Sequence, residues 1–178
     1  LSFMAAAAFV SVPAGSIKSS TINTFFPSTS PIMFIISDSL AQNDKCCIAL
    51  SGGSTPQPVF NELEKKSSQH VLDWSKVHVF FIDERCVPRE DKENNFNSCN
   101  ELWLRHYPNI QYHRIEGWID PKEAARAYER EIELTLDEKN GLPQFDLIFM
   151  GMGEDGHIAS LFPEYKFDNK TNRNVEDV

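Results

Sequence analysis

The segment 145–163, FDLIFMGMGEDGHIASLFP, places an apolar run directly before three glycines, with a carboxylate and an imidazole in the same turn. The apolar run 145–150 predicts a buried strand, and the glycines that follow let the backbone bend sharply and approach a ligand closely. Asp155 and His157 come next, and a histidine in such a turn can take or give a proton near neutral pH. The segment therefore predicts acid–base groups at the mouth of an open sheet.

The composition is that of one soluble globular domain. The chain has 178 residues, of which 41% are hydrophobic and 24% charged, and this length allows a sizeable core. The net charge is −9 and the pI about 5.0, which argues against a general nucleic-acid binder because such proteins carry a basic face. A small anionic substrate is compatible with this charge, since a local pocket can oppose the global field.

The cysteines and most histidines give no support for a metal centre, and we expect no metal. The four cysteines stand at positions 46, 47, 86 and 99, and none forms a C-x-x-C pair. Outside the glycine turn, no histidine pairs with another at metal-ligand spacing, and these are interpreted as structural: His70, His78, His106 and His113. Free thiols in an apolar run indicate a reducing compartment, and we expect a cytoplasmic protein.

The first 29 residues are expected to form a poorly ordered lead-in to a folded domain over 30–178. The apolar stretch 3–12 is too short to span a bilayer, and no basic residue precedes it as a secretory signal would require. Residues 1–37 contain no acidic residue, which leaves an organellar transit segment as an alternative, although Lys18 is the only basic residue there. We expect no contact with a membrane.

Strands and helices alternate along the rest of the chain. Pro31, Pro56 and Pro121 mark three helix starts, each after a Ser, Thr or Asp that can cap the helix. The predicted elements are helix 32–40, strand 46–50, a helix from 56, strand 77–82, helix 101–106, strand 111–115, a helix from 120 that Gly141 and Pro143 stop, and strand 145–150. This alternation predicts the α/β class, with an open, doubly wound and mostly parallel sheet. The polar stretch 86–100 is predicted to be a loop over the site, and the tail 168–178 to hold no element.

Three polar loops, 51–56, 83–89 and 151–157, are predicted to meet, because right-handed crossovers place the carboxyl ends of parallel strands on one edge. The first loop is rich in glycine and opens a helix, which suits an anion such as phosphate, although a plain tight turn is the alternative. It lacks the Walker A and dinucleotide-binding patterns. In the second loop, Arg85 can fork onto a phosphate and Asp83 can bind sugar hydroxyls or handle a proton. A surface ion pair is the alternative there.

Four short motifs follow one another along the chain. They are LSGGSTP at 50–56, DER at 83–85 with VP at 87–88, NN at 94–95, and GEDGHIASLFP at 153–163. Together they resemble the 6-phosphogluconolactonase family over about residues 30–165. The resemblance implies a Rossmann-like fold related to glucosamine-6-phosphate deaminase and ribose-5-phosphate isomerase. It also implies hydrolysis of 6-phospho-D-glucono-1,5-lactone to 6-phosphogluconate, in the oxidative pentose phosphate pathway, with no cofactor.

The resemblance further implies roles for the residues at matching positions. His157 would be the general base that activates water toward the lactone carbonyl, and Asp155 would orient it or contact a sugar hydroxyl. Arg85 and the glycine-rich loop would hold the phosphate, while Asp83 and Asn95 would line the sugar. The substrate-binding residues implied are Ser51, Gly52, Gly53, Ser54, Thr55, Asp83, Arg85, Asn95 and Gly156.

The sequence departs from the family pattern in two places. The family continues past the histidine loop with further strands and helices, including a basic residue that helps to hold the phosphate, whereas this chain has only the tail 168–178. The resemblance therefore implies a domain that is incomplete at its C-terminal end, or one piece of a longer polypeptide. In addition, Asn94 stands where the family commonly has Ser.

Two other functions stay open. Glucosamine-6-phosphate deaminase/isomerase belongs to the same structural group, but those relatives usually carry a glutamate after the histidine. No acidic residue lies between His157 and Pro163 here. The second alternative is a truncated, non-catalytic module that binds a sugar phosphate.

Overall fold

The computed structural model describes residues 5–8, 31–53, 56–67, 72–164 and 175–177. The helices are α1 (Pro31–Gln42), α2 (Gln57–Ser67), α3 (Asn95–Leu102) and α4 (Pro121–Thr135), with the 3₁₀ turns η1 (Trp74–Lys76) and η2 (Leu104–His106). The strands are β1 (Ala5–Ala8), β2 (Cys46–Leu50), β3 (Val77–Phe81), β4 (Asp83–Arg85), β5 (Gln111–His113), β6 (Glu138–Lys139), β7 (Leu142–Pro143), β8 (Leu147–Phe149) and β9 (Val175–Asp177). No helix among the described residues is long and apolar enough to cross a membrane.

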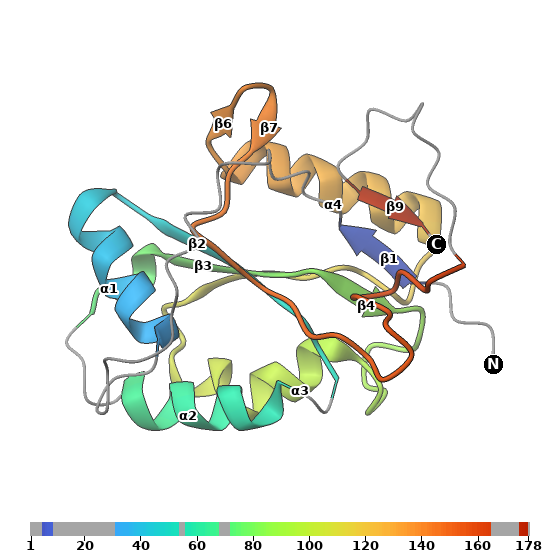
Figure 1. Ribbon diagram of the computed structural model, residues 1–178, viewed down its shortest axis with the longest axis horizontal. Helices are drawn as coiled ribbons and strands as arrows, with labels where there is room; N and C mark the ends of the chain where they lie inside the picture. The colour runs from blue at the N-terminus through green and yellow to red at the C-terminus, as the bar shows by residue number, and fades with distance from the viewer. Residues whose placement is uncertain (1–4, 9–30, 54–55, 68–71, 165–174, 178) are drawn as a thin grey trace.

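The main sheet has four parallel strands in the order β5-β3-β2-β8. Figure 1 shows α2 and α3 on one face of this sheet and α4 on the other. From β2 the chain adds β3 and β5 on one side, and α4 then returns it across the sheet to β8 on the other side. Crossovers of the same hand that run in opposite directions place their helices on opposite faces, so the sheet is doubly wound, as predicted. The strand order reverses between β2 and β8, where such sheets bind ligands.

The central strands are covered on both faces, and this explains their sequences. All five residues of β2 are buried, and so are four of the five residues of β3. A strand that is buried on both sides reads as a continuous apolar run, whereas a half-exposed strand alternates. The outer strands β5 and β8 have no buried residue. The buried core therefore lies along β2 and β3, between the two helical layers.

The predicted loop 86–100 is wrong over its second half, which forms most of α3. Asn94 caps this helix by accepting a hydrogen bond from the N–H of Asn97 at 3.1 Å. The Glu84 carboxylate accepts hydrogen bonds from the first two helical N–H groups, at 2.6 and 3.0 Å, although it lies 11 and 12 positions earlier in the chain. A local sequence pattern does not show such a distant cap. The predicted helix 101–106 is divided between the end of α3 and η2.

A second sheet, in the order β4-β1-β9, was not indicated by the sequence. The predicted loop at 83–85 is the antiparallel strand β4, which pairs with β1. The predicted lead-in 1–29 contains β1, and the tail 168–178, predicted to hold no element, contains β9. The other residues of these two stretches lie outside the described ranges.

Helix α4 begins where the sequence predicts and ends earlier. The Asp120 carboxylate accepts two N–H groups of the first turn at 3.0 and 3.2 Å, and Pro121 follows at the first helical position. The helix ends at Thr135 rather than running to the stop predicted at Gly141 and Pro143. Asn140 and Gly141, with φ of 57° and 79°, instead make the tight turn of the β6–β7 hairpin.

One side chain of α4 completes the edge of β3. Strand β5 ends at His113, which pairs with Phe80, so β5 does not reach the next residue of β3. The Tyr128 hydroxyl takes its place, donating to the C=O of Phe81 at 2.8 Å and accepting from the N–H of Phe81 at 2.8 Å. Tyr128 is buried, so this double contact fixes α4 on the sheet close to the carboxyl edge.

We expect Tyr128→Phe to lower the free energy of unfolding by about 2 kcal/mol, because two buried backbone groups of Phe81 lose their partner. Chemical denaturation monitored by circular dichroism measures this loss. Tyr112→Phe is the matched control, since Tyr112 is 51% exposed and its hydroxyl can bond to water. Equal effects of the two substitutions would show that the Tyr128 contact does not hold α4 on the sheet.

Candidate active site

The first and third predicted loops meet where the strand order reverses. The N–H of Ser51, directly after β2, donates to the C=O of Phe149 at 3.0 Å. The N–H of Gly151 donates to Ser51 Oγ at 3.3 Å. Ser51 is buried, so water competes little for these bonds. The glycine-rich loop after β2 and the glycine turn after β8 therefore start side by side at the carboxyl edge of the sheet.

A buried carboxylate joins the second region to the third. Asp83 is 6% exposed and accepts a hydrogen bond from Ser160 Oγ at 2.6 Å. Asn95 Nδ2 donates to the Asp83 carboxylate at 3.3 Å and to the Asp83 C=O at 3.0 Å. Burial raises the pKa of Asp83 above its usual value, while the Ser160 bond and the charges of Arg85 and His157 oppose this rise. These bonds connect Asp83 to the start of α3 and to the segment that follows the glycine turn.

The glycine-rich loop packs directly against Asn95. A Cβ atom added to Gly52 would fall on the Asn95 side chain, so only glycine fits there. Gly53 has open space around it but a φ of +84°, which side chains rarely allow. The two glycines are therefore needed for different reasons, close contact and backbone conformation. Ser54 and Thr55 lie outside the described residues.

Asp155 and His157 form a hydrogen-bonded pair on the glycine turn. The turn is closed by bonds from Gly156 N–H to the Gly153 C=O at 3.0 Å and from Gly153 N–H to the His157 C=O at 2.8 Å. Asp155 Oδ1 lies 2.5 Å from His157 Nδ1 and accepts the His157 backbone N–H at 3.2 Å. These bonds, the backbone one first, hold the pKa of Asp155 below its usual range. A carboxylate can only accept, so Nδ1 carries the hydrogen and Nε2 keeps a free lone pair.

The setting of His157 leaves the ring accessible but restrained. Its side chain is 36% exposed, and the Phe162 ring lies 5.1 Å from it between centroids. A Cβ on Gly153 would overlap the imidazole, so the ring packs closely against that glycine. Gly156 has a φ of +87°, which the turn needs. The Asp155 bond fixes the tautomer of the His157 ring, which therefore presents one basic nitrogen at the edge of the sheet.

The surface ion pair considered for residues 83–85 is not what the structure shows. Asp83 and Glu84 are both buried, and the Glu84 carboxylate also accepts the N–H of Arg85 at 2.8 Å. Arg85 reaches outward instead and pairs with Glu93 at 3.3 Å between Nη1 and Oε2. The Arg85 side chain is 32% exposed and the Glu93 side chain 58%, so a ligand could take the place of this weak partner.

Two residues of this arrangement were missed by the sequence analysis. Ser160 lies in the motif that contains His157, three positions after it, but nothing local shows that it bonds to Asp83. Glu84 stands in the DER motif, but only its hydrogen bonds in the structure reveal that it caps α3. In addition, His78 and His113, which show no pairing in the sequence, lie 3.0 Å apart between ring nitrogens, because β3 and β5 are neighbours. Among the described residues, no three ligand-type side chains gather closely enough to hold a metal ion.

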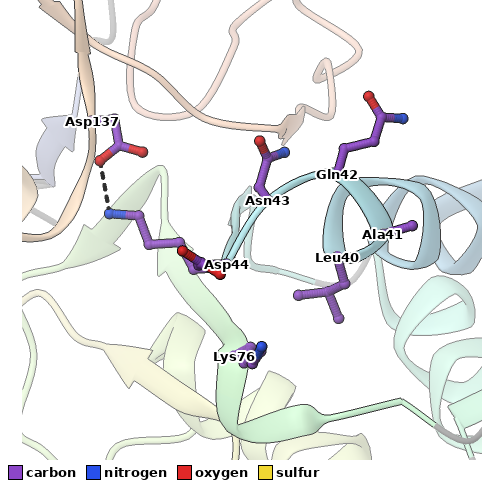
Figure 2. Close-up of a pocket in the computed structure, with 8 residues that line it drawn as sticks. Leu40, Ala41, Gln42, Asn43, Asp44, Lys76 and Asp137 are labelled. Carbon is purple, nitrogen blue, oxygen red and sulfur yellow. Dashed lines mark hydrogen bonds and ion pairs between the residues drawn. The ribbon is translucent and has the colours of Figure 1, made fainter.

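A polar cleft of about 620 Å³ lies at the other end of the sheet, where β2 and β3 begin (Figure 2). It is bordered by the end of α1, by Asp44 and Lys76, and by Asp137. Lys45 also lines it, but Lys45 Nζ pairs with Asp137 at 3.0 Å and donates to a backbone C=O at 2.7 Å. None of the residues predicted for chemistry lies there, so the carboxyl edge remains the candidate site.

Comparisons with known proteins match most of the described residues to one family. Residues 29–177 match the family model described as glucosamine-6-phosphate isomerases/6-phosphogluconolactonase. A 6-phosphogluconolactonase of Treponema pallidum is 43% identical over 119 residues, which are 65% of this chain and 48% of that protein. The crystal structure of 6-phosphogluconolactonase from Thermotoga maritima is 34% identical with a TM-score of 0.61, covering 73% of this chain and 56% of the other. The enzyme from Trypanosoma brucei is 28% identical with a TM-score of 0.66, covering 76% and 57%. The chain spans about half the length of these relatives.

We expect Ser160→Ala to destabilise the protein by about 2 kcal/mol at neutral pH, because the buried Asp83 carboxylate loses a hydrogen bond to its charged form. Burial already raises the pKa of Asp83 above 3.8, and the substitution should raise it further. Since the lost bond favours the ionised form, the difference from the wild type should shrink as the pH falls toward 4.

Denaturation curves at several pH values test this expectation. Ser75→Ala is the control, because Ser75 also bonds to a carboxylate, that of Asp73, but on the exposed surface. A Ser160→Ala variant as stable as Ser75→Ala at neutral pH would mean that the Asp83 contacts do not join the loops.

Proposed function

The chain belongs to the glucosamine-6-phosphate isomerase/6-phosphogluconolactonase family, and on this basis we propose that it hydrolyses 6-phospho-D-glucono-1,5-lactone to 6-phosphogluconate. The observation that carries the proposal is the Asp155–His157 pair, which presents a basic nitrogen at the carboxyl edge of the sheet. A lactone is electrophilic, and its leaving oxygen stays tethered to the product. A positioned base with nearby N–H donors therefore suffices for its hydrolysis.

His157 acts as the general base in this proposal. Its Nε2 takes a proton from a water molecule while the water oxygen bonds to the lactone carbonyl carbon. The tetrahedral intermediate collapses by breaking the ring C–O bond, and the departing ring oxygen takes the proton back from Nε2. Asp155 stays ionised, keeps the hydrogen on Nδ1 and stabilises the imidazolium that forms between these steps. One lactone and one water give one hydroxy acid, and the Asp155–His157 pair returns to its starting protonation state.

In this proposal, the phosphate and the sugar bind to the glycine-rich loop after β2 and to the region of Arg85 and Asn95. We assign the phosphate to the glycine-rich loop of Ser51, Gly52 and Gly53, ahead of α2, together with Arg85. This role for Arg85 requires it to leave Glu93. Asn95 Oδ1 is buried and has no hydrogen-bond donor among the described residues, which suits it to accept a sugar hydroxyl.

Asp83 has a supporting role in this proposal. It already accepts bonds from Ser160 and Asn95, so we assign it to holding Asn95 beside Gly52 rather than to binding the sugar at its own oxygens. Gly156 serves the site through its backbone, since its left-handed conformation lets the turn place His157. Ser54 and Thr55 continue the phosphate loop in the proposal.

The rival deaminase reaction is disfavoured by the segment after the histidine. The family model names both activities, and the resemblance places a proton-transferring glutamate in that segment of the deaminases. Here residues 158–162 are Ile-Ala-Ser-Leu-Phe, with no carboxylate. Ammonia release from glucosamine 6-phosphate measures this activity directly, and we expect none.

We expect the chain to accelerate hydrolysis of freshly made 6-phosphogluconolactone above the spontaneous rate, and His157→Ala to abolish that acceleration. Asp155→Asn should lower kcat by roughly 10²–10⁴, because the fixed tautomer and the stabilising charge are lost. His106→Ala, at an exposed histidine remote from the turn, is the control and should not change the rate. Normal turnover by a folded His157→Ala protein would overturn the assignment of the base. A folded wild-type chain without acceleration would favour the binding-module alternative.

We expect Arg85→Gln to raise KM for the phosphorylated lactone by about tenfold or more, because a charge-assisted contact to phosphate is lost. The KM for unphosphorylated gluconolactone should change little. Glu93→Gln is the matched variant, since it removes the competing carboxylate and should leave the first KM unchanged or lower it. If Arg85→Gln affects both lactones alike, then Arg85 does not hold the phosphate.

A further inference from the structure

A second cavity, of about 390 Å³, lies between the end of β5 and α4. Its walls include two arginines, Arg89 and Arg114, and the aromatic side chains of Tyr112, Trp118 and Tyr128. None of the residues predicted for lactone hydrolysis lines it. On the α4 side it is lined by Ala124 and Ala127, whose small side chains leave room beside the helix. A concave, partly aromatic space with a few polar groups is typical of a small-molecule site.

The guanidinium of Arg114 stacks on aromatic rings, but two of its nitrogens have no hydrogen-bond acceptor among the described residues. Its central carbon lies 3.9 Å from the centroid of the Phe96 ring and 5.0 Å from that of Trp118, so the group stacks on aromatic faces. Its Nε and Nη2 atoms are buried and have no hydrogen-bond acceptor among the described residues. These two N–H groups share one edge of the guanidinium, the edge that can bind two oxygens in parallel. Leaving both unpaired in a buried place is costly.

The charges around the cavity favour an anion with a single oxyanion group. Arg89 stacks on Trp118 as well, at 5.3 Å from the ring centroid, so two cations flank one indole. Burial, and then the charge of Arg89, lower the pKa of Arg114, although an arginine stays protonated. Of the acidic groups that line the cavity, Glu131 Oε1 lies 2.7 Å from His113 Nδ1. The other, Glu116, would repel a highly charged ligand.

We propose that this cavity is a binding site for a small organic oxyanion, a carboxylate or phosphate monoester that carries an apolar ring. Two oxygens of the ligand bond to Nε and Nη2 of Arg114, which requires this buried edge to turn toward the cavity. Arg89 supplies a second positive charge, and the ring packs between Trp118 and Tyr112. The cavity shares no lining residue with those assigned to the lactone, although Arg89 belongs to the same 83–89 loop, so the proposal does not depend on that function. It gives the unpaired edge of Arg114 the acceptors that the described residues do not supply.

Heteronuclear NMR of the 178-residue chain tests the proposal, with phenyl phosphate, benzoate and inorganic phosphate as probes. The readouts are the Trp118 indole N–H, identified by its loss in Trp118→Phe, and the Arg114 Nε–H. Titrations are made in the Arg85→Gln background, so that phosphate binding at the carboxyl edge does not contribute. We expect both signals to shift with phenyl phosphate or benzoate, and inorganic phosphate to bind more weakly because it lacks the ring.

Substitutions at Arg114 decide the outcome. We expect Arg114→Gln to weaken binding by about tenfold or more, because a paired, charge-assisted contact is lost. Arg114→Lys keeps the charge but loses the pair of parallel N–H groups, so it should also weaken binding. This second variant serves as the test if Arg114→Gln does not fold. Arg126→Gln is the control, since Arg126 is an exposed arginine of α4 that does not line the cavity. Failure of every probe to shift the Trp118 signal, or unchanged affinity in folded Arg114→Lys, would overturn the proposal.

Discussion

The carboxyl edge of this sheet depends on two neighbouring buried carboxylates. Asp83 receives hydrogen bonds from Ser160 and Asn95, and Glu84 receives three backbone N–H groups, two of them from the start of α3. Burial raises the pKa of both, so each carboxylate is tolerated only because donors surround it. The same bonds join regions that are far apart in the chain. The hydrogen bonds that stabilise these two buried carboxylates therefore also set the geometry of the candidate site.

The sequence could predict the part of the fold that depends on local pattern. The apolar runs 46–50 and 77–82 correspond to strands buried on both faces, and the caps at Asp120 and Pro121 correspond to the start of α4. Helix α3 and the sheet β4-β1-β9 could not be predicted in this way, because their support comes from distant residues. The role of Ser160 is hidden for the same reason, since its partner lies 77 positions earlier.

The contacts of the candidate site are likewise of two kinds, local ones that the sequence predicts and long-range ones that it does not. The Asp155–His157 pair is local, two positions apart on a glycine turn, and its contact could be anticipated from the sequence. The contact of Gly52 with Asn95 depends on the parallel register of the sheet and on α3. Such a contact cannot be predicted from a local sequence pattern.

Several apolar side chains lie exposed near the glycine turn, at Met150, Met152, Ile158 and Phe162. They follow β8 in the chain, and β8 is the outermost strand on that side among the described residues.

In the proposed function, three separate regions of the chain form one site for a phosphorylated sugar lactone. A structure of the chain with the product 6-phosphogluconate would show whether they do. We expect the C1 carboxylate of the product within hydrogen-bond distance of His157 Nε2, with the phosphate on the Ser51–Gly53 loop and Arg85. A product bound with C1 away from His157, or with its phosphate elsewhere on the protein, would contradict it.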